Sequence, residues 1–435
     1  MKSAQTMPVA LPSLGARVTP YIPLALFGAL GAVLSFLWKW PCRFGGAWND
    51  GTLQFTNFCY TDIYPLWWNE KLSEGKIPYF DYPVEYPVGI GGIMEIFRRI
   101  ASSMADPAVA FYDLTVILMA LCLIVGVVLM AALAGPTRRW DALWYALAPS
   151  LILTAYINWD LAAGALALAA MFAWSKQRQW LAGVMLGLAI ATKFYPVMFL
   201  GPLFLLTVRT GKWKPFLQTV GGVAASWLVV NVPVMLAAFP GWRKFYVFSQ
   251  ERRADWGSIW YFFGNKQWPF LGDPARLDML GIVSLGACCL AIAVLAVTAK
   301  TRPRLMQLCF LTLAAFMITN KVWSPQYVLW LIPFAVLARP NWKPIALWQI
   351  AECWYFFAIW LYLLTQRPES AALGITDDTY FTAVWGRVIT ILIMMGFVVR
   401  DILRPDKDVL RQDGIDDRSG GVFDGAPDKF RFALS

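Results

Sequence analysis

Residues 59–87 read CYTDIYPLWWNEKLSEGKIPYFDYPVEYP and follow the first strongly apolar segment of a very apolar chain. The stretch places Asp62, Asp81 and Glu85 among tyrosines and tryptophans. Carboxylates are costly inside a bilayer unless they face a partner or a water-filled cavity. We therefore expect this stretch to lie in water at a membrane surface or to line a polar cavity.

The composition indicates an all-α polytopic membrane protein. Of the 435 residues, 59% are hydrophobic and only 15% are charged, whereas a soluble chain carries about a quarter charged residues. Apolar runs of roughly 17 or more residues, long enough to cross a bilayer, recur from Tyr21 to Val399. The first run (21–37) continues into Trp38–Pro41 without a small-residue cleavage site, which predicts a retained span rather than a signal peptide.

Basic loops predict the topology. Short loops rich in Lys and Arg lie on the cytoplasmic side of membrane proteins, and the five short internal ones contain no acid other than Asp141, at the start of the next span. These loops are 138–139, 176–178, 209–214, 300–304 and 339–343. Taking them as cytoplasmic gives about twelve spans with both termini inside. The predicted spans are 21–37, 106–134, 141–157, 160–174, 180–192, 195–208, 216–237, 278–299, 304–319, 326–338, 343–365 and 381–399.

This topology divides the chain into a cytoplasmic N-terminus (1–20), a transmembrane domain (21–399) and a tail (400–435). The tail is polar and rich in Gly and Asp, and we expect it to be cytoplasmic and disordered. Two long loops, 38–105 and 238–277, then make up most of the exterior side. The net charge of +10 is explained by the basic loops, so we expect a lipid bilayer and no nucleic acid as partner.

With this topology the unusual polar clusters fall on the exterior side and suggest a single cavity. They comprise Asp62 and Glu85 in the first long loop and the segments 158–160, 193, 251–256 and 320–326. Two of the seven cysteines flank part of the first long loop, and an oxidising exterior would allow them to form a disulfide. These two are Cys42 and Cys59.

Asp62 is the candidate catalytic residue. The chain contains no His, so a general base must be a carboxylate, Lys, Tyr or Cys, and a carboxylate suits neutral pH. Alternatively, Asp62 caps the helix that we expect to begin near Tyr64. Glu85, held between two prolines, either is a solvated loop acid or orients substrate, and Asp81 is interpreted as scaffold.

Four cations could bind a lipid-linked phosphate, because Arg and Lys both suit that contact. They are Lys193, Arg252, Arg253 and Lys321. Equally, Lys193 could extend from a helix end toward water, and the arginine pair could be solvated. The other candidate substrate-binding residues are Glu85, Asp160, Trp256, Asn320 and Gln326; of these, Asp160 could instead pair with one of the cations.

Several familiar site motifs are absent from the sequence. It has no Walker-type loop, no dinucleotide glycine fingerprint and no Cys/His metal spacing. The predicted exterior acids form no Asp-X-Asp pair. We therefore expect neither a metal nor another cofactor, and a donor embedded in the lipid fits the absence of a nucleotide motif.

Five segments together resemble glycosyltransferase family 87, a group of integral membrane enzymes with the GT-C fold that is common in actinobacteria. They are CYTDI, EGKIPYFDYPVEYPV, GLAIATKFYPVMFLGPL, FSQERRADWGSIW and NKVWSPQYVLWLIP, in this order between about residues 40 and 340. The resemblance implies an inverting transferase with an exterior active-site cavity. It would move a sugar, typically mannose, from a polyprenyl-phosphate donor to a glycolipid or cell-envelope glycan. Asp62 occupies the place of the expected base, whereas the His usual near the pocket is missing.

A polytopic transporter or lipid flippase with an exterior polar vestibule is the alternative. Transporters usually place their charges near the bilayer midplane in broken helices. Here the polar motifs are predicted at one membrane face and the basic loops at the other. That distribution favours an enzyme at the plasma-membrane surface.

Overall fold

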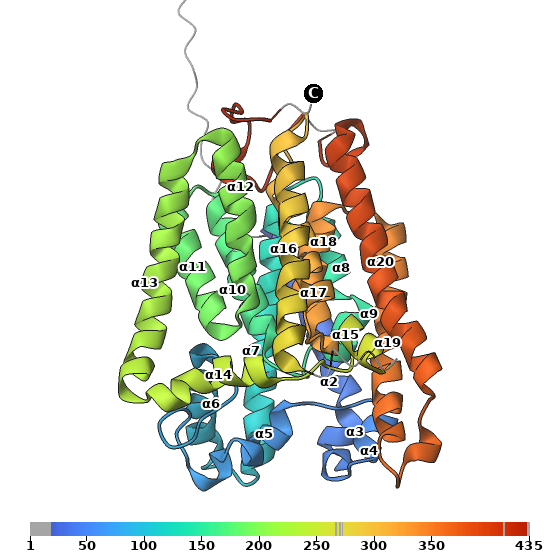
Figure 1. Cartoon of the computed structure of the whole chain (residues 1–435). Coiled ribbons are helices and arrows are strands. Elements are labelled where there is room, and N and C mark those ends of the chain that lie inside the picture. The colour runs from blue at the N-terminus through green and yellow to red at the C-terminus, as the bar shows by residue number, and fades with distance from the viewer. Residues whose placement is uncertain (1–18, 266–267, 269–270, 272, 412–413, 433–435) are drawn as a thin grey trace, which may run out of the picture.

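The structure is a computed structural model that describes residues 19–265, 268, 271, 273–411 and 414–432. The described residues fold into helices and connecting loops without any β-strand (Figure 1). This confirms the all-α polytopic fold class. The predicted N-terminal segment, 1–20, falls almost wholly outside the described residues.

Six described helices are long and apolar enough to cross a membrane. A helix of 25 residues is about 37 Å long, which exceeds the ~30 Å hydrocarbon core of a bilayer. The six are α2 (Ile22–Trp38), α7 (Pro107–Ala134), α13 (Trp213–Ala237), α16 (Pro274–Thr298), α19 (Trp342–Thr365) and α20 (Asp377–Leu403).

Shorter apolar helices complete the bundle. They are α10 (Asp160–Ser175), α11 (Gln179–Thr192), α12 (Leu200–Thr210), α17 (Leu305–Thr319) and α18 (Val328–Ala338). Every residue of α18 is buried, whereas α13 and α16 leave most of their apolar side chains at least partly exposed. A helix that is apolar on all sides is stable only when it is surrounded. The short helix α18 therefore lies inside the bundle, while α13 and α16 face the lipid.

One predicted span is not a continuous helix. Segment 141–157 contains α8 (Leu143–Ala146) and α9 (Pro149–Thr154), with Ala148 in an extended conformation between them. Proline has no amide hydrogen and disfavours helical geometry in the residue before it. Pro149 therefore ends one helical turn and begins the next. The other predicted spans each overlap one of the eleven helices above.

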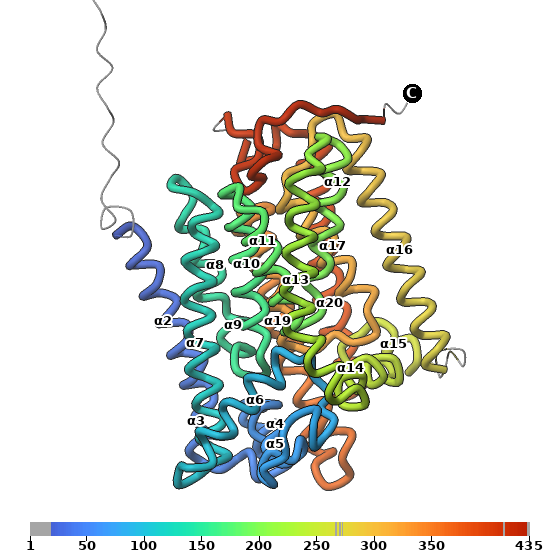
Figure 2. The backbone as a smooth tube through the Cα atoms, turned by 90° about the vertical axis from the view of Figure 1, so that its left-hand side faces the viewer, coloured from blue at the N-terminus to red at the C-terminus, as the bar shows by residue number. Residues whose placement is uncertain are grey.

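The non-spanning helices gather at one end of the bundle, which we call the loop end. They include α3 (Trp40–Arg43), α4 (Leu53–Thr56), α5 (Ile63–Asn69), α6 (Val88–Ala101), α14 (Phe239–Glu251) and α15 (Ile259–Asn265). The C-terminal residues cross the opposite end, which we call the tail end (Figure 2). The two predicted long loops thus lie together, away from the tail.

Three of the five basic loops, directly or through a neighbouring residue, contact the C-terminal residues at the tail end. Arg209 bonds to Asp428, Arg302 bonds to Asp416, and the indole of Trp174, next to loop 176–178, bonds to the Gly420 carbonyl. The other two loops meet each other, since the Arg138 guanidinium lies 3.4 Å from the Pro340 carbonyl oxygen. The predicted topology assigns these loops to one side of the membrane, and it therefore requires that they lie at the same end of the bundle.

The described part of the tail is folded, although its composition predicts disorder. Asp408 forms a buried ion pair with Arg304, and Arg302 pairs with both Asp416 and Asp428. Phe423 is fully buried, with its ring centroid 5.0 Å from that of Trp174. The polar composition of the tail does not reveal this packing, because the tail acids form ion pairs with arginines that are buried at the ends of the helices.

We expect Asp408→Asn to lower the free energy of unfolding by about 3 kcal/mol, because it leaves the Arg304 charge buried and uncompensated. Denaturant unfolding of the purified protein in mixed micelles measures this change. The matched control is Asp406→Asn, which removes an exposed acid paired with Lys407 and should stay within about 0.5 kcal/mol of wild type. Equal stability of the two variants would contradict a stabilising tail.

Candidate active site

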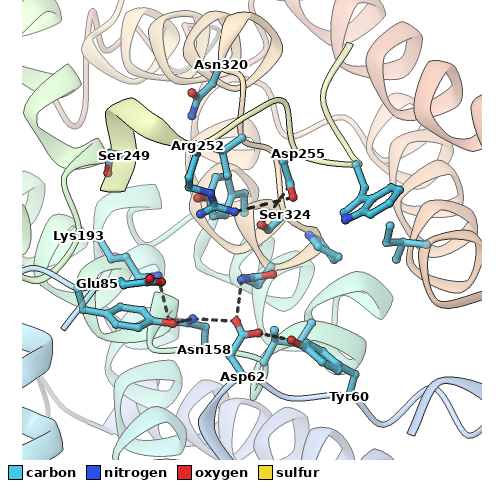
Figure 3. Close-up of a pocket in the computed structure, with 18 of the residues that line it drawn as sticks. Tyr60, Asp62, Glu85, Asn158, Lys193, Ser249, Arg252, Asp255, Asn320 and Ser324 are labelled. Atoms are coloured by element: carbon cyan, nitrogen blue, oxygen red, sulfur yellow. Dashed lines mark hydrogen bonds and ion pairs between the residues drawn. The ribbon is translucent and has the colours of Figure 1, made fainter. Parts of the chain in front are cut away.

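A cavity of about 790 Å³ opens at the loop end (Figure 3). Its lining comes from segments far apart in the sequence: the first long loop, the turn before α10, the end of α11, α14, the α17–α18 loop and α19. Eight predicted site residues line it together. They are Asp62, Glu85, Lys193, Arg252, Trp256, Asn320, Lys321 and Gln326.

Asp62 stands at the N-cap position immediately before α5, but its side chain makes no capping hydrogen bond. One carboxylate oxygen accepts a hydrogen bond of 2.7 Å from the Tyr60 hydroxyl. The other accepts one of 2.9 Å from the Asn158 amide and a longer one of 3.5 Å from the Gln326 amide. Of the two interpretations of Asp62, the structure removes the capping role and leaves a carboxylate that faces the cavity.

The backbone around Asp62 is tied to the bundle. Its amide donates to the Ile157 carbonyl at 2.9 Å, and the Thr61 hydroxyl donates to the Tyr156 carbonyl at 2.8 Å. A disulfide joins Cys42 and Cys59, whose Cα atoms are 5.8 Å apart. The acid is therefore presented by a rigid segment rather than by a free loop.

Lys193 connects two parts of the site. Its ammonium donates to the Asn158 side-chain oxygen at 3.0 Å and lies 3.4 Å from an Asp160 oxygen. Asp160 is fully buried, accepts a bond from the Trp330 indole and does not line the cavity. Its predicted contact with substrate therefore does not match its position. Instead, Asp160 compensates the charge of Lys193, as expected from the alternative that it pairs with one of the cations.

The two neighbouring arginines differ in position. Arg252 lines the cavity and lies only loosely against Asp255, at 3.9 Å. Burial raises the pKa of Asp255, and the charge of Arg252 partly offsets this effect. Arg253 is exposed and lies outside the cavity lining. The prediction that both arginines face the substrate is therefore corrected for Arg253.

The α17–α18 loop contributes a neutralised cation and two amides. The Lys321 ammonium lies 2.5 Å from an Asp278 carboxylate oxygen and donates to the Gln250 carbonyl at 2.8 Å. Asn320, at the start of this loop, and Gln326, near its end, also line the cavity. Because Lys321 already has an acidic partner, its charge is less available to a ligand than that of Arg252.

A buried arginine from α20 holds this loop in place. The Arg387 guanidinium carbon lies 4.0 Å from the ring centroid of Trp323 and 3.9 Å from that of Tyr355. It donates to the Trp323 carbonyl at 3.3 Å and pairs with Glu352 at 3.3 Å. Arg387 is not itself part of the cavity lining, so it acts as a positioning residue.

Two glutamates lie close together beside α14. Glu85 lines the cavity, and burial raises its pKa while Lys244 and Arg252 oppose the shift. Burial and the Glu85 charge raise the pKa of neighbouring Glu70 to about 7. Glu85 is therefore a further acid in the cavity lining, beside Asp62 and Asp255, and one that holds its proton more readily than an exposed glutamate.

The candidate site residues named from the sequence did not include five members of this arrangement. Asn158 and Asp255 belong to the polar clusters that the sequence marked, so their residue types were a usable signal. Tyr60 and Tyr86, whose hydroxyl lies 3.0 Å from the Asn158 amide nitrogen, look like ordinary aromatic residues. Arg387 sits in an apolar helix 325 residues after Asp62, and only folding brings it to the site.

We expect Arg387→Met to lower the free energy of unfolding by about 3 kcal/mol, because it strands the Glu352 carboxylate in an apolar interior. Adding Glu352→Gln should recover part of this loss, and Arg404→Met, at an exposed position, is the control. Thermal unfolding of the purified variants measures both effects. A double variant less stable than Arg387→Met alone would contradict the pairing.

Comparison with known proteins identifies the family of the chain. The model of glycosyltransferase family 87 matches residues 86–325, which is more than half of the 435 residues. No curated protein matches the chain. The matched range includes Asn158, Lys193 and Arg252 but begins after Asp62, so the assignment of Asp62 depends on the geometry above. The chain belongs to glycosyltransferase family 87 and is a membrane glycosyltransferase.

Proposed function

We propose that the protein is an inverting transferase that uses a polyprenyl-phosphate-linked sugar, with mannose as the first candidate. The acceptor is a hydroxyl of a glycolipid or cell-envelope glycan at the exterior face. One observation carries the proposal: the Asp62 carboxylate faces a large cavity, oriented by Tyr60 and Asn158, with a loosely paired arginine in the same lining.

In this mechanism Asp62 takes the proton of the acceptor hydroxyl as its oxygen attacks the anomeric carbon. A new carbon–oxygen bond forms, and the bond from that carbon to the phosphate oxygen breaks on the opposite face. The leaving phosphate carries the bonding electrons and is already close to its ionised state. A general acid is therefore not required, and stabilisation of negative charge becomes the second need.

The neighbours of Asp62 suit a base. Tyr60 donates a hydrogen bond to one carboxylate oxygen and Asn158 donates one to the other, so the orientation of the carboxylate is fixed. Asn158 is itself held by Lys193 through its side-chain oxygen. A base fixed in this way loses little entropy when the acceptor binds.

Arg252 is the first candidate for the donor phosphate. Its guanidinium can form two parallel bonds to phosphate oxygens, and its own acidic neighbour is 3.9 Å away. Lys193 and Lys321 have closer carboxylate partners, at 3.4 Å and 2.5 Å, so they add positive potential rather than a free charge. Arg253, outside the cavity lining, drops out of the set.

Two features support an exterior active site. The basic loops all lie at the tail end, which the charge rule assigns to the cytoplasm. The disulfide lies at the loop end, and disulfides persist on the oxidising side of a membrane. The transporter alternative is disfavoured, because the family is one of glycosyltransferases and the polar residues gather at one end of the bundle.

Asp62→Asn should lower kcat by about 10²–10⁴, the usual contribution of a general base, because an amide cannot accept the proton. Transfer of radiolabelled sugar from a polyprenyl-phosphate donor into lipid measures it. The control Asp81→Asn changes an exposed acid outside the cavity lining, whose side chain accepts a hydrogen bond from the Ile77 amide, and should be near wild type. Normal turnover of well-expressed Asp62→Asn would refute the assignment.

Arg252→Gln should lower kcat/KM by about 10², because it removes a charged contact to the leaving phosphate. The neighbouring variant Arg253→Gln has the same change of charge at an exposed position and should retain activity. Steady-state kinetics at varied donor concentration compare the two. If they lost activity equally, a general effect of surface charge would replace the specific contact.

A further inference from the structure

We infer that Lys39, which lies outside the cavity lining, is a positioning residue for the transfer reaction. Its buried ammonium holds the segment that carries Asp62 and stabilises the negative charge of that carboxylate. This inference rests on the proposed role of Asp62 as the base, and it adds a residue that acts through that base.

Lys39 is fully buried directly after the end of α2. Its ammonium donates a hydrogen bond of 2.7 Å to the Tyr60 carbonyl oxygen. The indole of the preceding residue, Trp38, donates one of 2.8 Å to the Phe58 carbonyl oxygen. Two consecutive side chains at the end of a spanning helix therefore hold the backbone that leads to Asp62.

The buried ammonium has no acidic partner, since none of the described carboxylates lies within 4.0 Å of it. Each of the other buried Lys and Arg side chains in the described part of the chain has a carboxylate oxygen at 3.3 Å or less. These are Arg209, Arg302, Arg304, Lys321 and Arg387. A buried charge without such a partner lowers stability, and proteins retain a cost of this kind mainly at functional sites.

Asp62 is the acid on which the Lys39 charge acts. The Tyr60 hydroxyl donates to one Asp62 oxygen at 2.7 Å, so the residue that Lys39 supports also orients the carboxylate (Figure 3). Burial lowers the pKa of Lys39 to about 7, and the charge of Asp62 opposes this shift. The interaction of two charges is mutual. The ammonium therefore stabilises the anionic carboxylate, which is the form that a base needs.

Tyr60 cannot take over this role, because it contributes no positive charge. Burial and the charge of Asp62 raise the pKa of Tyr60, so its hydroxyl stays a neutral donor. The Asn158 amide, the donor to the other carboxylate oxygen, is neutral as well.

The other charges on the elements packed against the end of α2 pair with one another or lie at the far end of the bundle. Arg43 of α3 pairs with Asp113 of α7 at 2.6 Å, and Glu352 of α19 pairs with Arg387 at 3.3 Å. Lys343 belongs to the first turn of α19, at the tail end. Helices α2, α8 and α9 contain no charged residue.

Lys39→Gln tests the charge, because glutamine can still donate to the Tyr60 carbonyl but is neutral. In the radiolabelled transfer assay, the acidic limb of its kcat/KM profile should move up by about one pH unit, as expected when a nearby opposite charge is lost. Lys76→Gln, at an exposed position of the same long loop, is the matched control and should keep the wild-type profile. An unmoved acidic limb in Lys39→Gln would overturn the inference.

A stability measurement reads the Lys39 charge without any turnover. The pKa of Lys39 in the folded protein, about 7, lies below its ordinary value of 10.5. The cost of burying the charge is therefore fully present below the folded value and fades as the pH rises toward the ordinary one. Lys39→Met should melt at or above the wild-type temperature at about pH 6, and the difference should shrink at about pH 9. A lower melting temperature at the acidic pH would overturn the inference, because Lys39 would then serve only the packing of the loop.

The inference and the proposed function fail separately. Normal turnover by Asp62→Asn would refute the base, and with it the group on which Lys39 acts. Loss of turnover in Asp62→Asn together with an unmoved acidic limb in Lys39→Gln would leave the base in place and overturn the role of Lys39 alone.

Discussion

The ion pair between Lys193 and Asp160 is the contact on which the site depends. Neither charge could stay in this apolar surrounding alone, because an uncompensated ion away from water costs several kcal/mol. Together they fix the end of α11 against the start of α10. Lys193 then holds Asn158, and Asn158 holds Asp62. An ion pair that compensates two charges inside the bundle thus also orients the Asp62 carboxylate in the cavity.

The same constraint explains features far from the cavity. Arg387 and Glu352 pair between α19 and α20, and this pair supports the loop that carries Gln326 to Asp62. At the tail end, Arg304 and Asp408 compensate each other in the interior. Pairing of buried charges therefore both assembles the site and fastens the chain end to the helices.

The cavity gathers cations from three distant segments around the Asp62 carboxylate. Three of the cations differ in how closely an acid compensates them, from 2.5 Å for Lys321 to 3.9 Å for Arg252. These differences give the residues separate roles, which their similar appearance in the sequence does not indicate.

The sequence by itself determined the fold class, the apolar helices and the basic loops, because the bilayer imposes length, apolarity and charge bias on each segment separately. It also marked Asp62 and the segments that line the cavity. Only the tertiary structure decided that Asp160 pairs with Lys193, that Arg253 lies outside the cavity lining, and that the described part of the polar tail is folded. These outcomes depend on which charged residues, often far apart in the sequence, form contacts in the fold. Local composition carries no information about such contacts.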